Sequence, residues 1–206
     1  MMNEWCERIR KIEASYDKKA DKEWAQTEQL KNDLRRHRDA SRGLTPQLFD
    51  RILSWKLRGQ RARTEEHRRN VEKQMLNDIT ACAFKLTHAN RECLAAARLK
   101  LLSSLPGVGY GVASSMMALV FPEQYGVIDS RVWKVIFDED RTSFTVPQYL
   151  RYMNAVWACA ERLRWEPQKV DYFNLVNPPT PKQALAVSFT GNTRIHVESA
   201  ERMGID

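Results

Sequence analysis

The chain has 206 residues, which is enough for one domain, or one domain with an appendage, around a substantial buried core. Its 33 lysine and arginine residues outnumber 26 acidic residues to give a formal net charge of +7, which suits a folded nucleic-acid binder and equally an ordinary basic surface. No stretch approaches about 18 uninterrupted apolar residues and the N-terminus lacks a signal-peptide run, so we expect a cytoplasmic protein without a membrane span.

Residues 1–42 are dense in charge of both signs but carry an intermittent apolar stripe. Its members at helical spacing are Trp5, Ile9, Ile12, Tyr16, Leu30 and Leu34. The stripe predicts one or two amphipathic helices, either broken around residues 17–22 or continuous, and the interleaved charges favour pairing along the helix. We interpret this segment as an N-terminal extension that packs on the rest of the chain, with a partner-docking or DNA-clamping arm as the alternative.

A helix is predicted to begin at Thr45 and Pro46, because a hydroxyl side chain caps a helix and proline is favoured at its first position. Its apolar face would comprise Leu48, Phe49, Ile52, Leu53 and Trp55, and its end is expected near Gly59. Basic residues then follow closely in the loop: Lys56, Arg58, Arg61 and Arg63. They predict phosphate contacts strengthened by counterion release, with an ordinary solvated loop as the alternative.

Two helices are predicted between this loop and a glycine-containing turn. The first would run from Glu65 to about Leu86, and the second from an Asn90 cap to Ser104. The apolar face of the first would consist of Val71, Met75, Ile79 and Ala83, and that of the second of Leu94, Ala97, Leu101 and Leu102.

After the turn, a helix over 110–121 is predicted by Val112, Met116, Leu119 and Val120. Three more are expected: a short one over 132–136, one starting at Thr145 and Pro147, and one from Pro167 through Val176. Prolines in 177–181 end the helical body. The sequence therefore indicates an all-α fold with an extension over 1–42, a helical domain over 43–177, and a tail over 178–206 that holds a possible small β-hairpin around residues 190–193.

The turn between the two central helices has the sequence Leu105-Pro106-Gly107-Val108-Gly109. Glycines permit positive φ and close approach of another backbone, and proline fixes one dihedral angle. The amide groups of Gly107, Gly109 and the first helical turn after them would point outward at a helix N-terminus, where the dipole favours an anion. This predicts a grip on a nucleic-acid backbone, or alternatively a glycine-rich helix connection without a ligand.

The hairpin and the later segment Tyr125–Lys134, which reads YGVIDSRVWK, together resemble the helix-hairpin-helix (HhH-GPD) DNA glycosylase superfamily. That family includes the endonuclease-III-like and adenine-mismatch glycosylases, in which an LPGVG hairpin is followed, one helix and one loop later, by an essential aspartate. The separation of Leu105 from Asp129 is similar. The likeness is strong over about residues 93–137 and weaker back to residue 44. The chain is also similar to a group of bacterial proteins that share the hairpin, a YGVIDxR-like stretch and the pair Trp55–Lys56.

The resemblance implies that Asp129 is a catalytic carboxylate. Loss of a base from a deoxynucleoside builds positive charge on the sugar, and an ionised carboxylate beneath the ring stabilises that charge and orients a water toward C1′. Asp129 also precedes a predicted helix, whose dipole favours the charged form. The structural alternative is an aspartate that only caps this helix.

The residues expected to bind DNA are Leu105, Gly107, Val108, Gly109, Gly111, Arg131, Lys134, Lys56, Arg58 and Arg61. Bifunctional relatives carry a lysine at the position of Gly111 that attacks the sugar, so the resemblance implies a monofunctional enzyme that leaves an abasic site; Lys56 and Lys134 are the alternative amines. The target base must leave the stack, and the candidates for its pocket are Trp55, Tyr110 and Trp133, each of which can instead belong to the core.

The partner implied is double-stranded DNA with a damaged or modified base, either a repair lesion or a modified base of phage DNA. The four cysteines and four histidines have no ligand spacing, so we expect a core without an iron–sulfur cluster, no metal site and no cofactor, apart from a possible monovalent cation at the hairpin carbonyls. The oligomeric state is left open, with a monomer expected. Two other functions remain: a non-catalytic helix-hairpin-helix DNA-binding module, and a hairpin used for protein contact.

Overall fold

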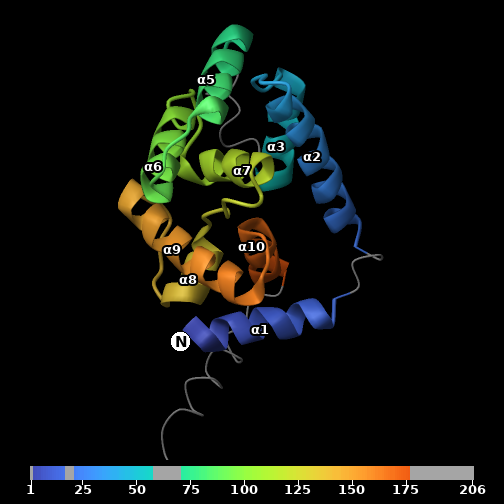
Figure 1. Cartoon of the computed structure of the whole chain (residues 1–206), viewed down its shortest axis with the longest axis vertical. Coiled ribbons are helices and arrows are strands. Elements are labelled where there is room, and N and C mark those ends of the chain that lie inside the picture. The colour runs from blue at the N-terminus through green and yellow to red at the C-terminus, as the bar shows by residue number, and fades with distance from the viewer. Residues whose placement is uncertain (1, 17–20, 58–70, 177–206) are drawn as a thin grey trace, which may run out of the picture.

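The computed structural model of the chain describes residues 2–16, 21–57 and 71–176, and within these residues every element is an α-helix (Figure 1). The all-α prediction is therefore confirmed for this part, while the possible β-hairpin around residues 190–193 lies outside it. The helices are α1 (Met2–Ala14), α2 (Lys22–Asp39), α3 (Pro46–Leu57), α5 (Lys73–Lys85), α6 (Arg91–Leu102), α7 (Tyr110–Val120), α8 (Ser130–Phe137), α9 (Val146–Leu163) and α10 (Pro167–Val176).

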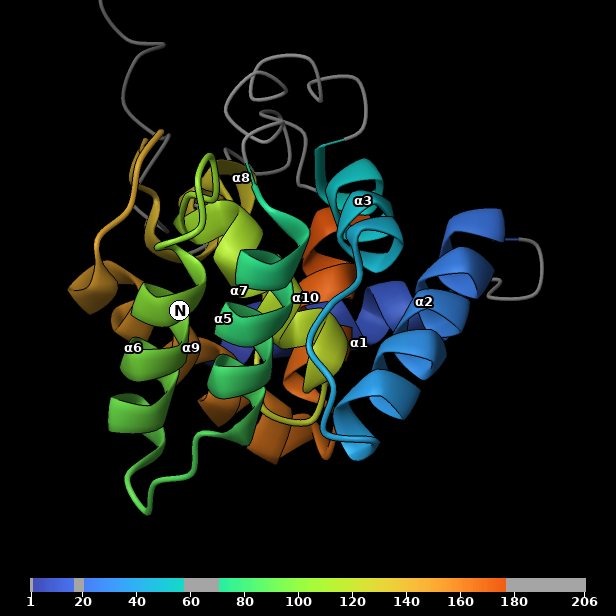
Figure 2. The same cartoon turned by 90° about the horizontal axis from the view of Figure 1, so that it is seen from above.

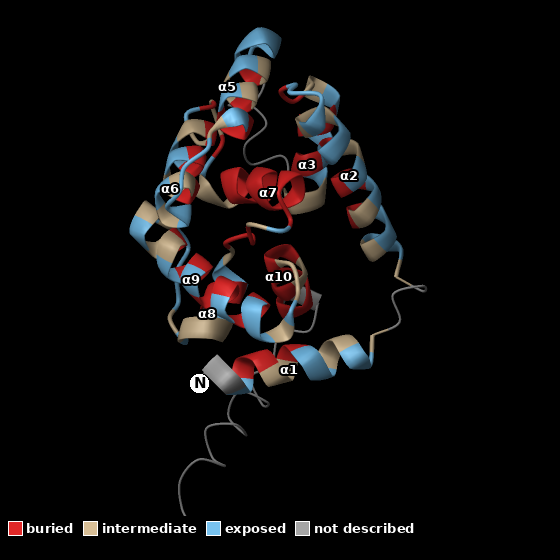
Figure 3. Cartoon of the chain, viewed as in Figure 1, coloured by how far each residue is buried: buried red, intermediate tan, exposed pale blue. Residues whose placement is uncertain are grey.

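Helix α7 lies at the centre of the molecule. It contacts α2, α3, α6 and α10, and all of its residues from Val112 to Val120 are buried (Figures 1 and 3). Several of these have small side chains, namely Ala113, Ser114, Ser115 and Ala118. Small side chains let neighbouring backbones approach closely, which suits a helix that packs against four others.

The other helices form two groups around α7: one contains α2, α3, α5 and α6, and the other contains α1, α8, α9 and α10. Seen from above, α2 and α3 lie on one side of α7 and α5 and α6 on the other (Figure 2). Helices α8, α9 and α10 lie together, and α1 crosses them while packing against α9 and α10 (Figure 1). The contact between α6 and α9 joins the two groups.

Two helix starts are formed by the residues that the sequence indicates. The Asn90 side chain accepts hydrogen bonds from the backbone N–H groups of Glu92 at 2.8 Å and Cys93 at 3.0 Å, which confirms the predicted cap of α6. At α3, the Thr45 hydroxyl accepts from the Leu48 N–H at 3.3 Å, and Pro46 is the first helical residue.

The prediction of a helix over 65–86 is wrong about where the helix begins. The described helix α5 begins at Lys73, and residues 65–70 lie outside the described part. Glu72 has φ −63° and ψ 141°, an extended conformation that cannot continue a helix backward from α5. The short helix expected over 132–136 is longer than predicted, because α8 runs from Ser130 to Phe137.

The buried face of α6 differs from the predicted one. Leu102 is buried as predicted, but Ala97 is exposed, Leu94 and Leu101 are only partly buried, and the other buried residues are Ala95, Arg98 and Leu99. The Arg98 guanidinium is stable inside because it donates to the carbonyls of Ala83 at 3.1 Å and Leu86 at 2.9 Å and to the Tyr125 hydroxyl at 3.1 Å. A buried arginine thus connects the end of α5 to the segment that leads to α8.

The N-terminal helices take part in the core. Trp5, Cys6 and Ile9 of α1 are buried, as are Leu30 and Leu34 of α2. The Trp5 indole N–H donates to Oδ1 of Asn174 in α10 at 3.1 Å, so the two ends of the described chain are bonded to each other. None of the described helices combines the length and the apolar character needed to cross a bilayer.

Candidate functional site

The turn between α6 and α7 is a tight hairpin held by its own backbone. The Val108 N–H donates to the Leu105 carbonyl at 3.0 Å, and Gly107 has φ 72°, a left-handed conformation that favours glycine. Leu105 and Val108 are buried, at 2% and 4% exposure, so they anchor the hairpin.

Gly109 directly precedes α7 and faces open space. It is the N-cap residue, no side chain caps this helix end, and nothing described lies within 4 Å of the place where a Cβ on Gly109 would stand. The N-terminus of α7 therefore presents its backbone to an approaching group. Such an end attracts anions, because the helix dipole and the unpaired amide groups act together.

A cavity of about 610 Å³ lies beside this helix end. It is lined by α3, the hairpin and start of α7, the start of α8 and the loop before α9, through Lys56, Ser103, Val108, Gly109, Tyr110, Gly111, Ile128, Asp129, Ser130, Thr142, Ser143 and Phe144. Among these lining residues, Asp129 carries the one carboxylate and Lys56 the one amine. The cavity thus brings together a carboxylate, an amine and an open helix N-terminus.

Asp129 caps α8 and has partners on both carboxylate oxygens. Oδ1 accepts the Arg131 backbone N–H at 2.9 Å and the Arg131 Nε at 3.3 Å, and Oδ2 accepts from Nζ of Lys56 at 3.0 Å. Burial raises the pKa of Asp129, but the Lys56 ammonium and the Arg131 N–H outweigh burial, so the net pKa lies below its ordinary value. The carboxylate is therefore ionised at neutral pH.

Lys56 reaches the cavity from the last turn of α3. Its neighbour Trp55 is fixed to α2, because the Trp55 indole N–H donates to the Thr27 hydroxyl at 2.8 Å. Lys56 projects instead toward α7, where its Cε is 4.0 Å from the position of a Cβ on Gly111. The side chain of Lys56 is 12% exposed and that of Asp129 is 19% exposed, so this ion pair is largely shielded from solvent.

The segment before Asp129 is held from behind by buried polar groups. The Ile128 N–H donates to the Ser114 hydroxyl at 3.1 Å, which ties the segment to α7. A Cβ on Gly126 would meet the Tyr152 hydroxyl at 2.7 Å, so the segment passes closer to α9 than another residue would permit. That hydroxyl donates to Oδ1 of Asp171 in α10 at 2.8 Å. Helices α7, α9 and α10 therefore hold in place the segment that precedes Asp129.

Asp171 is fully buried beneath this segment. Burial raises the pKa of Asp171 to about 7, while the Tyr152 hydroxyl and the Val127 N–H favour its ionised form less strongly. No motif in the sequence pointed to Asp171 or Ser114, because each acts through a contact between distant parts of the chain.

The aromatic pocket candidates are placed differently from one another. Tyr110 lines the cavity and is partly exposed. Trp55 is partly buried and does not line it, and Trp133 is wholly buried, with Phe137 and Phe144 packed against its indole ring. Trp133 therefore has no surface on which a base could stack in this conformation, because α8 turns its apolar side to the core. Phe144, which the sequence did not single out, lines the cavity.

The basic residues predicted to contact phosphate also differ in their surroundings. Arg131 lies beside Asp129 with a side chain that is 68% exposed. Lys134 is directed elsewhere, because its Nζ pairs with Asp138 and Asp140, each at 3.1 Å, and these bonds raise the Lys134 pKa. Arg58 and Arg61 lie outside the described residues.

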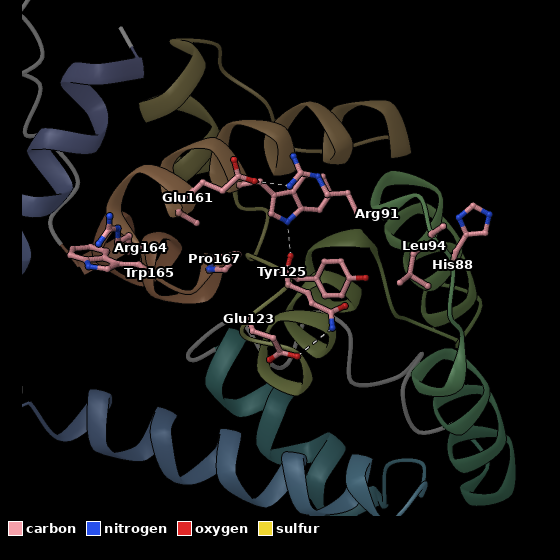
Figure 4. Close-up of a pocket in the computed structure, with 13 residues that line it drawn as sticks. His88, Arg91, Leu94, Glu123, Tyr125, Glu161, Arg164, Trp165 and Pro167 are labelled. Carbon is pink, nitrogen blue, oxygen red and sulfur yellow. Dashed lines mark hydrogen bonds and ion pairs between the residues drawn. The ribbon is translucent and has the colours of Figure 1, made fainter.

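A second cavity, of about 450 Å³, lies between α6, α9 and the start of α10 (Figure 4). Arg91 in this cavity donates a hydrogen bond to the Glu161 carboxylate at 2.9 Å (Figure 4). The Arg91 guanidinium also lies 4.4 Å from the centre of the Trp157 ring. Glu123 is likewise paired, with Arg38 at 3.2 Å. The side chains of Arg91 and Glu161 are 57% and 68% exposed, whereas the Lys56–Asp129 pair is shielded and lies beside a helix end without a side-chain cap, so we take the hairpin cavity as the candidate site.

Comparisons of the chain with protein families, with curated proteins and with solved structures found no match. Within residues 2–16, 21–57 and 71–176, no three histidine, cysteine or acidic side chains are grouped as ligands of a metal ion would be. The candidate site therefore rests on its own geometry and on the motif in its sequence.

Proposed function

We propose that the chain is a DNA glycosylase of helix-hairpin-helix type that removes a damaged or modified base from duplex DNA by hydrolysis of the N-glycosidic bond. The observation that carries the proposal is the shared cavity of Asp129 and the α7 N-terminus: an ionised, partly shielded carboxylate lies beside a helix end without a side-chain cap. A site that binds a phosphate backbone and attacks its sugar needs both groups near each other.

Asp129 would act on the sugar. As the bond to the base breaks, positive charge develops at C1′ and the ring oxygen, and a carboxylate in a shielded site stabilises this charge more strongly than it would in water. The same carboxylate can orient the water that attacks C1′ and accept its proton. Because Arg131 and Lys56 hold both oxygens of Asp129, little reorganisation is needed when the sugar arrives.

The hairpin would hold the strand on which the target nucleotide lies. The backbone around Gly107 and Gly109 and the first turn of α7 offer amide groups to a phosphate without reading base sequence. Arg131 adds an exposed cation beside the site, and the net charge of +7 favours approach to DNA. The flipped base would enter the cavity between Tyr110 and Phe144.

The decisive experiment measures base release from a panel of duplexes that carry oxidised, alkylated, deaminated, mismatched or naturally modified bases. Wild type, Asp129→Asn and a control, Asp78→Asn at an exposed position of α5, are compared by mass spectrometry of free base and by alkali-labile sites. Asparagine also caps helices, so Asp129→Asn should fold. We expect at least about a 100-fold loss of base release in Asp129→Asn and none in the control.

A second function is favoured by one observation: Asp129 already has a structural role, since it caps α8 and pairs with Lys56. A non-catalytic DNA-binding module would retain these contacts. It is the correct description if duplex binding persists while no substrate in the panel releases a base in an Asp129-dependent way. A surface for protein contact is instead indicated if the chain has no salt-sensitive affinity for DNA.

A further inference from the structure

We propose that Lys56 condenses with the sugar after base loss and thereby nicks the DNA strand at the abasic site. This inference rests on the proposed function and extends it, because hydrolysis alone would end at an intact strand. The absence of an amine at Gly111 predicts that outcome from sequence, whereas the folded chain brings an amine to the same place from a different helix.

The distance between Lys56 and Asp129 is the first support. Nζ of Lys56 is 3.0 Å from Oδ2 of Asp129, so a C1′ atom held against that carboxylate is also within reach of the amine. Lys56 is 12% exposed and follows a tryptophan that is bonded to α2, so its side chain is directed into the cavity rather than free in solvent. Both reacting groups are therefore positioned before substrate arrives.

The space beside α7 is the second support. With no side chain at position 111, the nearest atoms to a Cβ there would be the Ile128 carbonyl oxygen at 3.7 Å and Cε of Lys56 at 4.0 Å. The Lys56 stem thus runs along the face that the glycine leaves bare, at the very start of α7. A bulkier residue at 111 would compete with Lys56 for this position.

Lys134 is the other amine that the sequence suggests, and its geometry argues against it. Its Nζ lies 3.1 Å from Asp138 and from Asp140, its side chain is 45% exposed, and it does not line the cavity. Among the described residues that do line the cavity, Lys56 alone carries an amine.

The chemical step needs no reagent beyond water and the abasic product. The ammonium of Lys56 first releases a proton to water, and the neutral Nζ attacks C1′ of the open-chain aldehyde to form an N–C bond. The C1′ hydroxyl then takes up a proton and leaves as water, which gives a protonated imine. Removal of the C2′ proton by water then shifts electrons to break the C3′–O bond, and the 3′-phosphate departs. Hydrolysis of the imine finally releases Lys56 and an unsaturated aldehyde on the upstream strand.

The test uses a duplex with one preformed abasic site, which makes it independent of the base that the protein excises. Wild type, Lys56→Ala, Lys56→Arg, Lys134→Ala and Lys85→Ala are incubated with this duplex and sodium borohydride. Covalent protein–DNA adducts are counted on denaturing gels and mapped by peptide mass spectrometry. Lys85 is an exposed lysine at the end of α5 that lines neither cavity. Arginine keeps the positive charge beside Asp129 but forms no such imine.

We expect wild type and Lys85→Ala to form the adduct on a peptide that contains Lys56, and both Lys56 variants to lose at least nine-tenths of it while still binding the duplex. Wild type that binds the duplex and forms no adduct overturns the proposal, as does an adduct that survives in Lys56→Ala or that disappears only in Lys134→Ala.

Different results would overturn the glycosylase proposal and the proposal for Lys56. Base release without an adduct would leave the glycosylase standing as a monofunctional enzyme and remove the role of Lys56. An adduct without base release from any member of the panel would support the amine and reject the glycosylase.

Discussion

Nζ of Lys56 and Oδ2 of Asp129 are 3.0 Å apart although 73 positions separate the two residues in the chain. The pair joins the end of α3 to the start of α8 across the N-terminus of α7. Each residue therefore sets the electrostatic environment of the other.

Replacement of Lys56 by methionine should raise the pKa of Asp129. Burial, which raises this pKa, remains, whereas the opposing ammonium is lost. Base release, which requires the ionised carboxylate, should therefore fall off at a higher pH in Lys56→Met than in wild type. Single-turnover rates from pH 4 to pH 8 measure the shift, with Lys56→Arg as the charge-retaining control. An acid limb that is the same in wild type and Lys56→Met contradicts the assignment of Asp129.

Two glycines of the hairpin should respond differently to alanine. Gly107 has φ 72°, so Gly107→Ala should lower the free energy of unfolding by about 1–2 kcal/mol. Gly109 has φ −80° and open space at its Cβ position, so Gly109→Ala should cost less stability but place a methyl group where the strand approaches. Urea titration and duplex binding separate the effects. Equal losses of stability, with unchanged binding by Gly109→Ala, would count against the hairpin as the DNA contact.

Arg131 should contribute one phosphate contact. Its side chain is 68% exposed, and its backbone N–H, which bonds Asp129, is retained in Arg131→Ala. The slope of log affinity against log salt concentration should therefore fall in magnitude by about 1. Fluorescence anisotropy between 50 and about 300 mM salt measures the slope. Arg162→Ala in α9, which lines neither cavity, is the control, and an equal change in both variants would argue against a specific contact.

Asp171 should make the folded state less stable as pH rises. In the folded chain its pKa is about 7, whereas an unfolded aspartate titrates near about 3.9. Between these values the folded state binds more protons, so this contribution to stability is greatest below about pH 4 and is lost progressively up to about pH 7. Asp171→Asn should flatten the dependence, as thermal melting between pH 4 and pH 8 can measure. A wild-type profile that rises over this whole range and is unchanged by the substitution would show that Asp171 ionises normally.

Much of the local structure could be predicted because the signals lie within a few residues of one another. Asn90 caps α6 through the N–H groups of its near neighbours, and Thr45 and Pro46 start α3 in the same way. Asp129 was expected directly before a helix, and it caps α8. In each case the backbone donor and the side-chain acceptor are close in the sequence, so the local residue pattern is enough to predict where the helix begins.

Other features could not be predicted because their partners come from distant segments. Arg98 looks like an exposed helix residue until the carbonyls that end α5 surround its guanidinium. Trp133 has the position of a pocket residue in the motif but the surroundings of a core residue. The place of Lys56 beside Gly111 depends on the packing of α3 against α7, which no spacing within either helix encodes.

The bond between Trp5 and Asn174 has a consequence for the order of events during synthesis. Among the described helices α1 is made first, yet its apolar face packs on α9 and α10, which are made last. Until residue 176 has emerged, α1 has no native surface to cover, and Asp171 is not yet beneath the segment that carries Asp129. Asp129 would thus acquire its final setting late, and until then the apolar face of α1 would lack the surface that buries it.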